Sequence, residues 1–229
     1  MSCILHIETS TEVCSVALSQ DSSCIFTQES EGRYEHGECL GTYVDQALSY
    51  ADSHAIPLDA VAVSCGPGSY TGLRIGVSMA KGLCYGLGVP LIAIPTLKLM
   101  GVPLLLGDDL PEGALLCPMI DARRMEVYSA VYDRALKEVC SPAAVVVDSD
   151  SFARELEQGE VWFFGNGASK CREVITHRNA HFVDGVRPLA QWMFPLAEMA
   201  FARQEFADVA YFEPYYLKEF VASVPRRLL

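Results

Sequence analysis

The sequence predicts an α/β protein of two lobes, in which helices cover mixed β-sheets. In its first part, short apolar runs typical of strands alternate with longer runs of helical periodicity, in the order β-β-β-α-β-α-β. Near residues 101–113 the composition changes to Pro, Gly and acidic residues, and strand-like runs then begin again. We therefore expect a first lobe over residues 1–104 and a smaller α/β lobe over residues 105–229, whose last helix packs back on the first lobe.

Apolar or alternating runs predict the opening strands of the first lobe. They lie at residues 4–8, 13–19 and 25–30. From Glu38 onward, apolar residues recur at the spacing of an amphipathic helix, until Pro57 prevents its continuation. The remaining elements of this lobe are a strand over 60–65, a Gly-rich loop over 66–72, a helix over 71–88 and a strand over 91–94.

The second lobe is predicted from strand-like runs followed by a helix. The runs lie at residues 115–120, 126–132, 143–147 and 161–164. Asp121, Arg123 and Glu126 lie at the turn between the first two, where such charges are typical of an exposed hairpin rather than of a catalytic cluster. Pro195 is suited to a first helical turn and marks the start of the last helix.

The composition excludes several classes of protein. With 51% hydrophobic and 20% charged residues, the 229-residue chain should form a packed core. Its 17 Lys and Arg against 29 Asp and Glu give a charge of −12, so we expect no tight binding of nucleic acid by this chain alone. The longest uncharged run, residues 82–97, is too short for a membrane span, and no signal peptide is evident, so we expect a cytoplasmic protein without membrane contact. The nine cysteines include no Cys-x-x-Cys pair and predict reduced thiols.

The Gly-rich loop is neither of the two common phosphate loops. A P-loop would have Lys and then Ser or Thr after its last glycine, but Leu73 and Arg74 follow Gly72. The glycine spacing also differs from the dinucleotide-binding pattern. Two interpretations stay open: amide groups at the start of the helix bind an anion, or Ser69 or Thr71 only caps the helix.

A stripe of small residues runs along the helix that follows this loop. Gly72, Gly76 and Ala80 lie four residues apart and so share one face. A glycine inside a helix costs about 1 kcal/mol relative to alanine, so close packing of a second helix should offset this cost. The spacing does not decide whether that second helix belongs to this chain or to a partner.

Four blocks of sequence carry a resemblance to a known family. They are Cys65-Gly66-Pro67-Gly68-Ser69-Tyr70-Thr71-Gly72-Leu73-Arg74-Ile75-Gly76, Ile7-Glu8-Thr9-Ser10, Ile120-Asp121-Ala122-Arg123 and Pro214-Tyr215-Tyr216-Leu217. Over nearly its whole length, the chain resembles the TsaB (YeaZ) family, paralogues of the tRNA threonylcarbamoyltransferase TsaD. The resemblance implies the actin, hexokinase and sugar-kinase (ASKHA) superfamily fold, with two RNase H-like lobes. It also implies a non-catalytic activating or dimerisation subunit that binds TsaD and enables threonylcarbamoyl transfer to the adenosine next to the tRNA anticodon.

The resemblance and the small-residue stripe together predict the sites. We expect the first two helices to pack on the equivalent helices of TsaD through Leu40, Tyr43, Val44, Ala47, Gly72, Leu73, Gly76, Val77, Ala80 and Leu83. The candidate contacts for a nucleotide or an anion are Glu8, Thr9, Ser10, Gly68 and Ser69. The resemblance implies the ATPase TsaE as a further partner, ATP and Mg²⁺ only at the interface with TsaD and TsaE, and no cofactor of the chain's own. Two copies of the chain could also form a homodimer, and tRNA would be reached only through the complex.

We expect no catalytic residue and no metal site in this chain. TsaD holds its metal with a His-x-x-x-His pair on a helix, whereas His36 is followed four residues later by Leu40. His177 and His181 have the same spacing, in a stretch that reads as a loop. Glu8 stands where the superfamily usually has Asp, which weakens the case for ATP hydrolysis. Two alternatives stay open: a small-molecule kinase or ATPase of the superfamily, and a metallopeptidase-like protein.

Overall fold

The computed structural model describes residues 2–30, 35–107 and 110–218 and contains two five-stranded sheets. The first sheet has the order β3-β2-β1-β4-β5. Its strands are β1 (Cys3–Glu8), β2 (Ser15–Gln20), β3 (Ser23–Glu29), β4 (Ala60–Gly66) and β5 (Leu91–Pro95). The first three strands are antiparallel neighbours, and β4 and β5 run parallel to β1. All of these strands were predicted.

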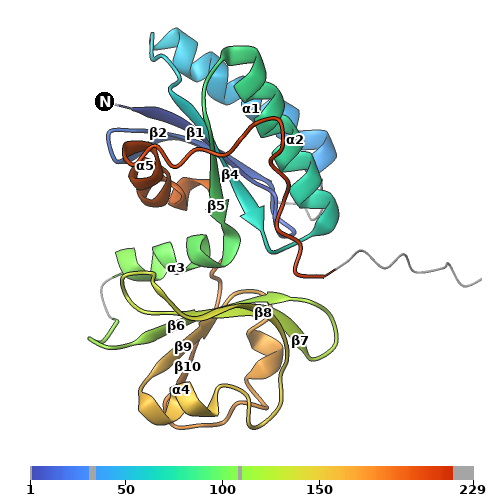
Figure 1. Ribbon diagram of the computed structural model, residues 1–229, viewed down its shortest axis with the longest axis vertical. Helices are drawn as coiled ribbons and strands as arrows, with labels where there is room; N and C mark the ends of the chain where they lie inside the picture. The colour runs from blue at the N-terminus through green and yellow to red at the C-terminus, as the bar shows by residue number, and fades with distance from the viewer. Residues whose placement is uncertain (1, 31–34, 108–109, 219–229) are drawn as a thin grey trace, which may run out of the picture.

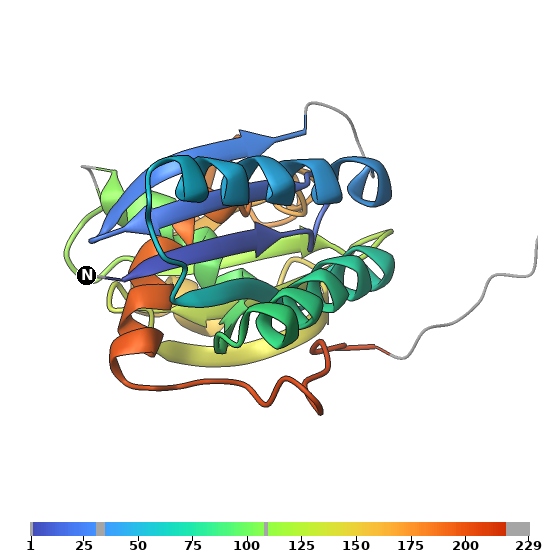
Figure 2. The same ribbon diagram turned by 90° about the horizontal axis from the view of Figure 1, so that it is seen from above.

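Helices cover both faces of the first sheet. In Figure 1, α1 (His36–Ser53) and α2 (Tyr70–Leu87) lie on one side of the sheet and α5 (Phe194–Ala202) on the other. The view from above in Figure 2 shows α1 and α2 side by side. Strand β1 is therefore buried along its whole length, with Ile4 in the cluster toward α5 and Leu5 in the cluster toward α1 and α2.

The second sheet repeats the topology of the first, in the order β10-β9-β6-β7-β8. Its strands are β6 (Leu115–Asp121), β7 (Glu126–Tyr132), β8 (Glu138–Val146), β9 (Val161–Phe164) and β10 (Ala180–Val183). Again three strands form an antiparallel meander, and the last two are parallel to its first strand. The predicted two-lobed α/β fold is thus confirmed. The sequence missed the short helix α4 (Ala153–Gln158) and β10, so His181 lies in a strand and not in a loop.

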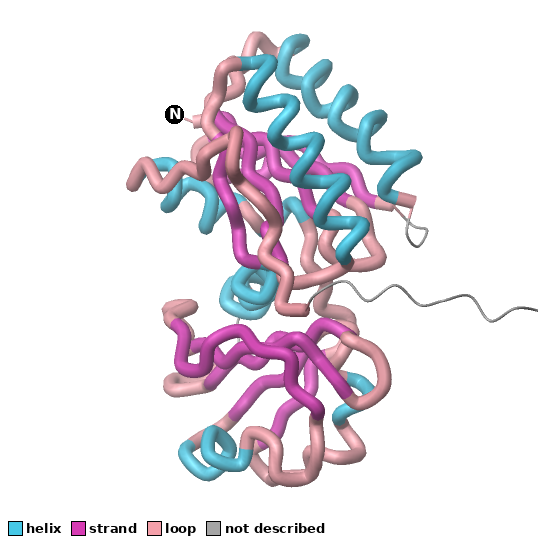
Figure 3. Tube along the Cα trace, turned by 45° about the vertical axis from the view of Figure 1, so that its right-hand side comes forward, coloured by secondary structure: helices cyan, strands magenta, loops and turns pink. Residues whose placement is uncertain are grey.

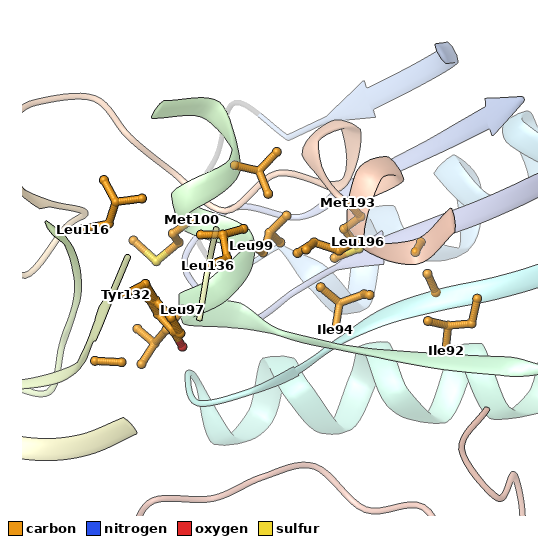
Figure 4. Close-up of a cluster of buried hydrophobic side chains, with 14 of the residues drawn as sticks. Ile92, Ile94, Leu97, Leu99, Met100, Leu116, Tyr132, Leu136, Met193 and Leu196 are labelled. Carbon is orange, nitrogen blue, oxygen red and sulfur yellow. The ribbon is translucent and has the colours of Figure 1, made fainter. Parts of the chain in front are cut away.

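Helix α3 (Thr96–Leu106) connects the two sheets (Figure 3). The sequence does not predict this helix, because Gly101 and Pro103 suggest a break and because the helix has no polar face. It is buried between the lobes, with Leu97, Leu99 and Met100 packed among residues of both sheets (Figure 4). The boundary expected after residue 104 falls inside this helix.

The chain returns to the first lobe at its C-terminal end. The 3-10 helix η2 (Ala190–Trp192) and α5 pack against the first sheet, where Met193 and Leu196 join the cluster that contains Ile94. Beyond α5 the chain runs along the edge of the sheet, where the Ala207 amide donates to the Leu91 carbonyl at 2.8 Å. None of the described helices is long and apolar enough to cross a membrane. All nine cysteines, which lie within the described residues, are free, as predicted.

Candidate functional site

The small-residue stripe of α2 lies against this chain's own first strand-turn. A Cβ atom at Gly72 would approach the Thr9 carbonyl oxygen, and one at Gly76 would approach Thr9 Oγ1, in both cases closer than 3.0 Å. Thr9 Oγ1 donates a hydrogen bond to the Gly72 carbonyl at 2.8 Å. The glycines therefore let α2 lie directly on the turn that follows β1.

This packing shows that most residues of the predicted partner interface are buried inside this chain. The residues that face the protein's own core are Leu40, Val44, Ala47, Gly72, Leu73, Gly76, Val77 and Ala80. They were expected to meet a partner, but the sheet beneath the helices and the turn at Thr9 already cover them. Only Tyr43 and Leu83 of the predicted set retain partial exposure.

A second set of helical glycines points outward. They are Gly37 and Gly41 on α1 and Gly82 and Gly86 on α2. A Cβ atom at any of them would have nothing within 4 Å in the described part of the chain. Since each such glycine costs a helix about 1 kcal/mol relative to alanine, internal packing does not explain these positions. The sequence already contained this signal, because Gly82 and Gly86 are poor helix formers inside a helix that is predicted and continuous.

The outer face of α2 is also hollowed. Arg74, Ile75, Ser78, Met79 and Gly82 line a shallow depression of about 550 Å³. It forms because Ser78 and Gly82, which follow Arg74 along one row of the helix at four-residue spacing, leave little side chain beside the half-buried Ile75 and Met79 of the next row. We call this depression, together with the outward glycines of α1 and α2, the open helix face. A face of this shape can accept a partner's helix at short range.

A separate cavity of about 570 Å³ lies between the two lobes. Its walls come from the turn after β1, the start of α2, the β6–β7 turn and the C-terminal segment, and include Ser10, Gly68, Ser69, Asp121, Arg123, Asn166 and Lys218. Asn166 Nδ2 donates to Glu12 Oε2 at 2.8 Å and so joins the lobes across the cavity. Lys218 forms an ion pair with Glu126 and joins the C-terminal segment to β7.

The candidate nucleotide contacts lie in two places, the lining of this cavity and the buried core. Ser10, Gly68 and Ser69 line the cavity, whereas Glu8 and Thr9 are fully buried and do not line it. Ser69 Oγ accepts from the Gly72 amide at 3.2 Å, so Ser69 caps α2. The Ser69 amide in turn donates to the Ser10 carbonyl at 2.7 Å and fixes the start of α2 to the turn.

Glu8 is the most unusual titratable group near the cavity. Its Oε1 accepts from the Ser10 amide at 2.5 Å, while its Oε2 has no hydrogen-bond partner among the described residues. Burial raises the pKa of this carboxyl to about 7. His6, two residues earlier on β1, shows the opposite effect, because burial lowers the pKa of its imidazole to about 3. Near neutral pH, Glu8 is therefore divided between its neutral and charged forms.

We predict that Glu8→Gln gains stability relative to the unchanged chain as the pH rises. In the folded state Glu8 keeps its proton up to about pH 7, whereas in the unfolded state it loses the proton above about pH 4.5. The stabilisation that the bound proton gives the folded unchanged chain is therefore complete below pH 4.5 and is lost as the pH rises through 7. Gln stays neutral, and the difference in free energy of unfolding should move in its favour by about 3 kcal/mol between roughly pH 4.5 and pH 8. Urea denaturation at a series of pH values measures it. The His6 contribution is the same in both proteins and cancels, so a difference independent of pH would contradict the assignment.

The remaining candidate catalytic groups are engaged in structural contacts. Asp121 Oδ1 accepts from the Arg123 amide at 2.9 Å and pairs with Lys170, as expected for a charged hairpin turn. His36 is buried, and its Nε2 donates to the Thr11 carbonyl at 2.8 Å. His181 stacks on Trp162, with ring centroids 4.9 Å apart. Among the described residues, no group of three or more His, Cys, Asp or Glu side chains could hold a metal ion.

The duplicated sheet topology and the cavity between the lobes define the class of protein: a two-lobed α/β protein of the ASKHA type. The model of the family described as TsaD, tRNA N6-adenosine threonylcarbamoyltransferase, matches residues 30–224. The protein named tRNA threonylcarbamoyladenosine biosynthesis protein TsaB from Escherichia coli is 32% identical over 226 residues, which cover 96% of each chain. Its namesake from Bacillus subtilis is 30% identical and covers 75% of this chain and 74% of its own.

A solved structure supports the same relationship. The structure titled YeaZ from Pseudomonas aeruginosa has a TM-score of 0.75 and 26% sequence identity to this chain, with coverage of 95% of this chain and all of its own. The chain belongs to the TsaB (YeaZ) family.

Proposed function

We propose that this chain is a non-catalytic subunit of tRNA N6-threonylcarbamoyladenosine biosynthesis that binds a TsaD protein and activates it. The observation that carries the proposal is the open helix face, where outward glycines weaken two helices without any packing benefit from the described residues. The occupant we assign is the equivalent helix pair of TsaD. A match of this chain to the TsaD family model over residues 30–224 supports that pairing, since paralogues present similar surfaces.

Binding alone can produce the activation. If this chain binds only the competent conformation of TsaD, it raises the population of that conformation and contributes no catalytic atom. The small side chains of Ser78, Gly82 and Gly86 let the helices cross closely, while Ile75 and Met79 supply apolar contact. This assignment replaces the buried stripe of Gly72, Gly76 and Ala80 as the contact surface.

The charge of −12 supports the proposal that the partner, and not this chain alone, binds the tRNA. Affinity for RNA comes largely from Lys and Arg that neutralise phosphates, so TsaD or the joint surface would hold the substrate. We propose that ATP and Mg²⁺ act only where this chain, TsaD and the ATPase TsaE meet, and that the chain has no cofactor of its own. Because the open helix face could also pair with a second copy, homodimer and heterodimer would compete.

One observation favours a second candidate, a small-molecule kinase or ATPase. The cavity between the lobes has the start of α2 in its wall, where free amide groups attract anions. However, Glu8, one of the candidate nucleotide contacts, lies fully buried and outside the cavity lining. Release of phosphate from ATP by the purified chain alone would support this candidate.

Sedimentation of the purified chain with TsaD from the same organism tests the proposed association. We expect a one-to-one complex that forms at the expense of any homodimer, so the homodimer fraction should fall as TsaD is added. The second lobe offers a control: Gln158→Leu places an apolar side chain on an exposed position of α4, far from the open helix face, and should bind TsaD like the unchanged chain. Two species that sediment independently at micromolar concentration would contradict the proposal.

A further inference from the structure

The C-terminal segment 207–218 runs beside α2 for much of its length (Figures 1 and 3). It begins where Ala207 pairs with Leu91 and ends at the ion pair of Lys218 with Glu126 on the second lobe. Between these points the Tyr215 amide donates to the Cys65 carbonyl at 2.7 Å. The segment therefore forms a fixed border along the flank of α2.

A hydrogen-bonded turn over residues 208–212 lies near the start of this border. Asp208 Oδ1 accepts from the Ala210 amide at 2.8 Å and from the Tyr211 amide at 3.3 Å, and the Phe212 amide donates to the Asp208 carbonyl at 2.8 Å. Lys81 Nζ of α2 donates to the carbonyls of Ala210 at 3.2 Å and Phe212 at 2.9 Å. These bonds hold both sides of Tyr211 in place.

Tyr211 itself points away from the chain. Its side chain is 85% exposed, although Val209 and Phe212 on the same turn pack against the core. Tyr85 of α2 is 87% exposed and lies one helical turn beyond Lys81, which anchors the Tyr211 turn. These are the two most exposed large apolar side chains among the described residues. Tyr85 lies on α2 between the outward Gly82 and Gly86 in the sequence, and Tyr211 lies on the turn that Lys81 of α2 holds.

We infer that Tyr85 and Tyr211 form an aromatic extension of the open helix face and contact the same helical partner. Tyrosine is enriched among the residues that dominate binding energy, because it buries a large area with few rotatable bonds. The bonds from Asp208 and Lys81 hold Tyr211 in place before binding, which reduces the entropy lost on association. The inference rests on the proposed function. It adds a second contact with the same partner, and the residues that make this contact lie far from α1 in the sequence.

The test compares the affinity of TsaD for the unchanged chain, Tyr85→Ala, Tyr211→Ala and Lys81→Met by titration calorimetry. We expect each tyrosine variant to bind at least about tenfold more weakly. Lys81→Met keeps both rings and loosens only the turn, so it should weaken binding by less, roughly threefold, and the loss should vanish in a Tyr211→Ala background. Val146→Ala, which removes an exposed apolar side chain from β8, is the matched control and should bind like the unchanged chain.

The fold should tolerate these tyrosine changes, since the rings make little contact with the chain, and equal melting temperatures would verify this. Tyrosine variants with the affinity of the Val146→Ala control would overturn the inference, while a loss of binding in Gly82→Leu would leave the proposed function intact. Failure of the unchanged chain to bind TsaD would overturn both.

Discussion

Gly82→Leu should weaken binding to TsaD by roughly 10- to 100-fold while the isolated chain keeps its fold. A Cβ at this position meets nothing within 4 Å in the described chain, so the leucine side chain extends into open space on the outer side of α2. In the complex the same space would hold a partner helix, and overpacking of a close contact typically costs about 1–3 kcal/mol. Titration calorimetry measures the affinity, and thermal melting measures the fold.

The matched control for this variant is Gln158→Leu, which adds the same side chain to an exposed helical position of the second lobe. It should change neither the melting temperature nor the affinity. The interface assignment fails if Gly82→Leu binds TsaD as tightly as this control does.

Gly72→Ala and Gly82→Ala should have opposite effects on stability, although both lie on α2. A methyl group at Gly72 collides with the backbone carbonyl of Thr9, which cannot move without disturbing the turn after β1, so we expect a loss of about 3 kcal/mol or more. At Gly82 the methyl group meets open space, and better helix propensity should add about 0.5–1 kcal/mol. Urea denaturation of the isolated chain measures both changes.

This pair of variants distinguishes the glycines that pack against Thr9 from those that point outward, and it does so without any partner present. Equal effects at the two positions would mean that α2 does not rest on Thr9 as described. For the same reason, Gly76→Leu is a poor test of partner binding, because its side chain would collide with Thr9 and would weaken the fold first.

The sequence predicted helices α1 and α2 because each has one exposed face and therefore a helical alternation of polar and apolar residues. It predicted strands β1 to β5 because they are apolar or alternating runs that end at clear breaks. Helix α3 was missed because sheets cover it on two sides and it therefore has no polar face. Its Gly101, which suggested a break in the sequence, is a packing residue that makes room for Leu136 of the second lobe. Periodicity predicted two lobes but showed the repeat less clearly in the second, and the resemblance to the family implied that both lobes are RNase H-like.

The candidate site was predicted only in part, for a physical reason. A stripe such as Gly72, Gly76 and Ala80 shows that something approaches the helix closely, but spacing does not show whether that neighbour is internal. The structure identifies it as Thr9 of the same chain, whereas Gly82 and Gly86 of the same helix have no packing role among the described residues. The Tyr211 turn had no sequence signal, since its position depends on Lys81, 130 residues earlier in the chain.

The most direct test of the central claim is threonylcarbamoyl transfer to unmodified tRNA by TsaD of the same organism, with TsaE, ATP and threonylcarbamoyl-AMP supplied. The account predicts that transfer depends on this chain, and that Gly82→Leu reduces it while Gln158→Leu does not. Transfer at the full rate without the chain, measured with folded and active TsaD, would contradict the account.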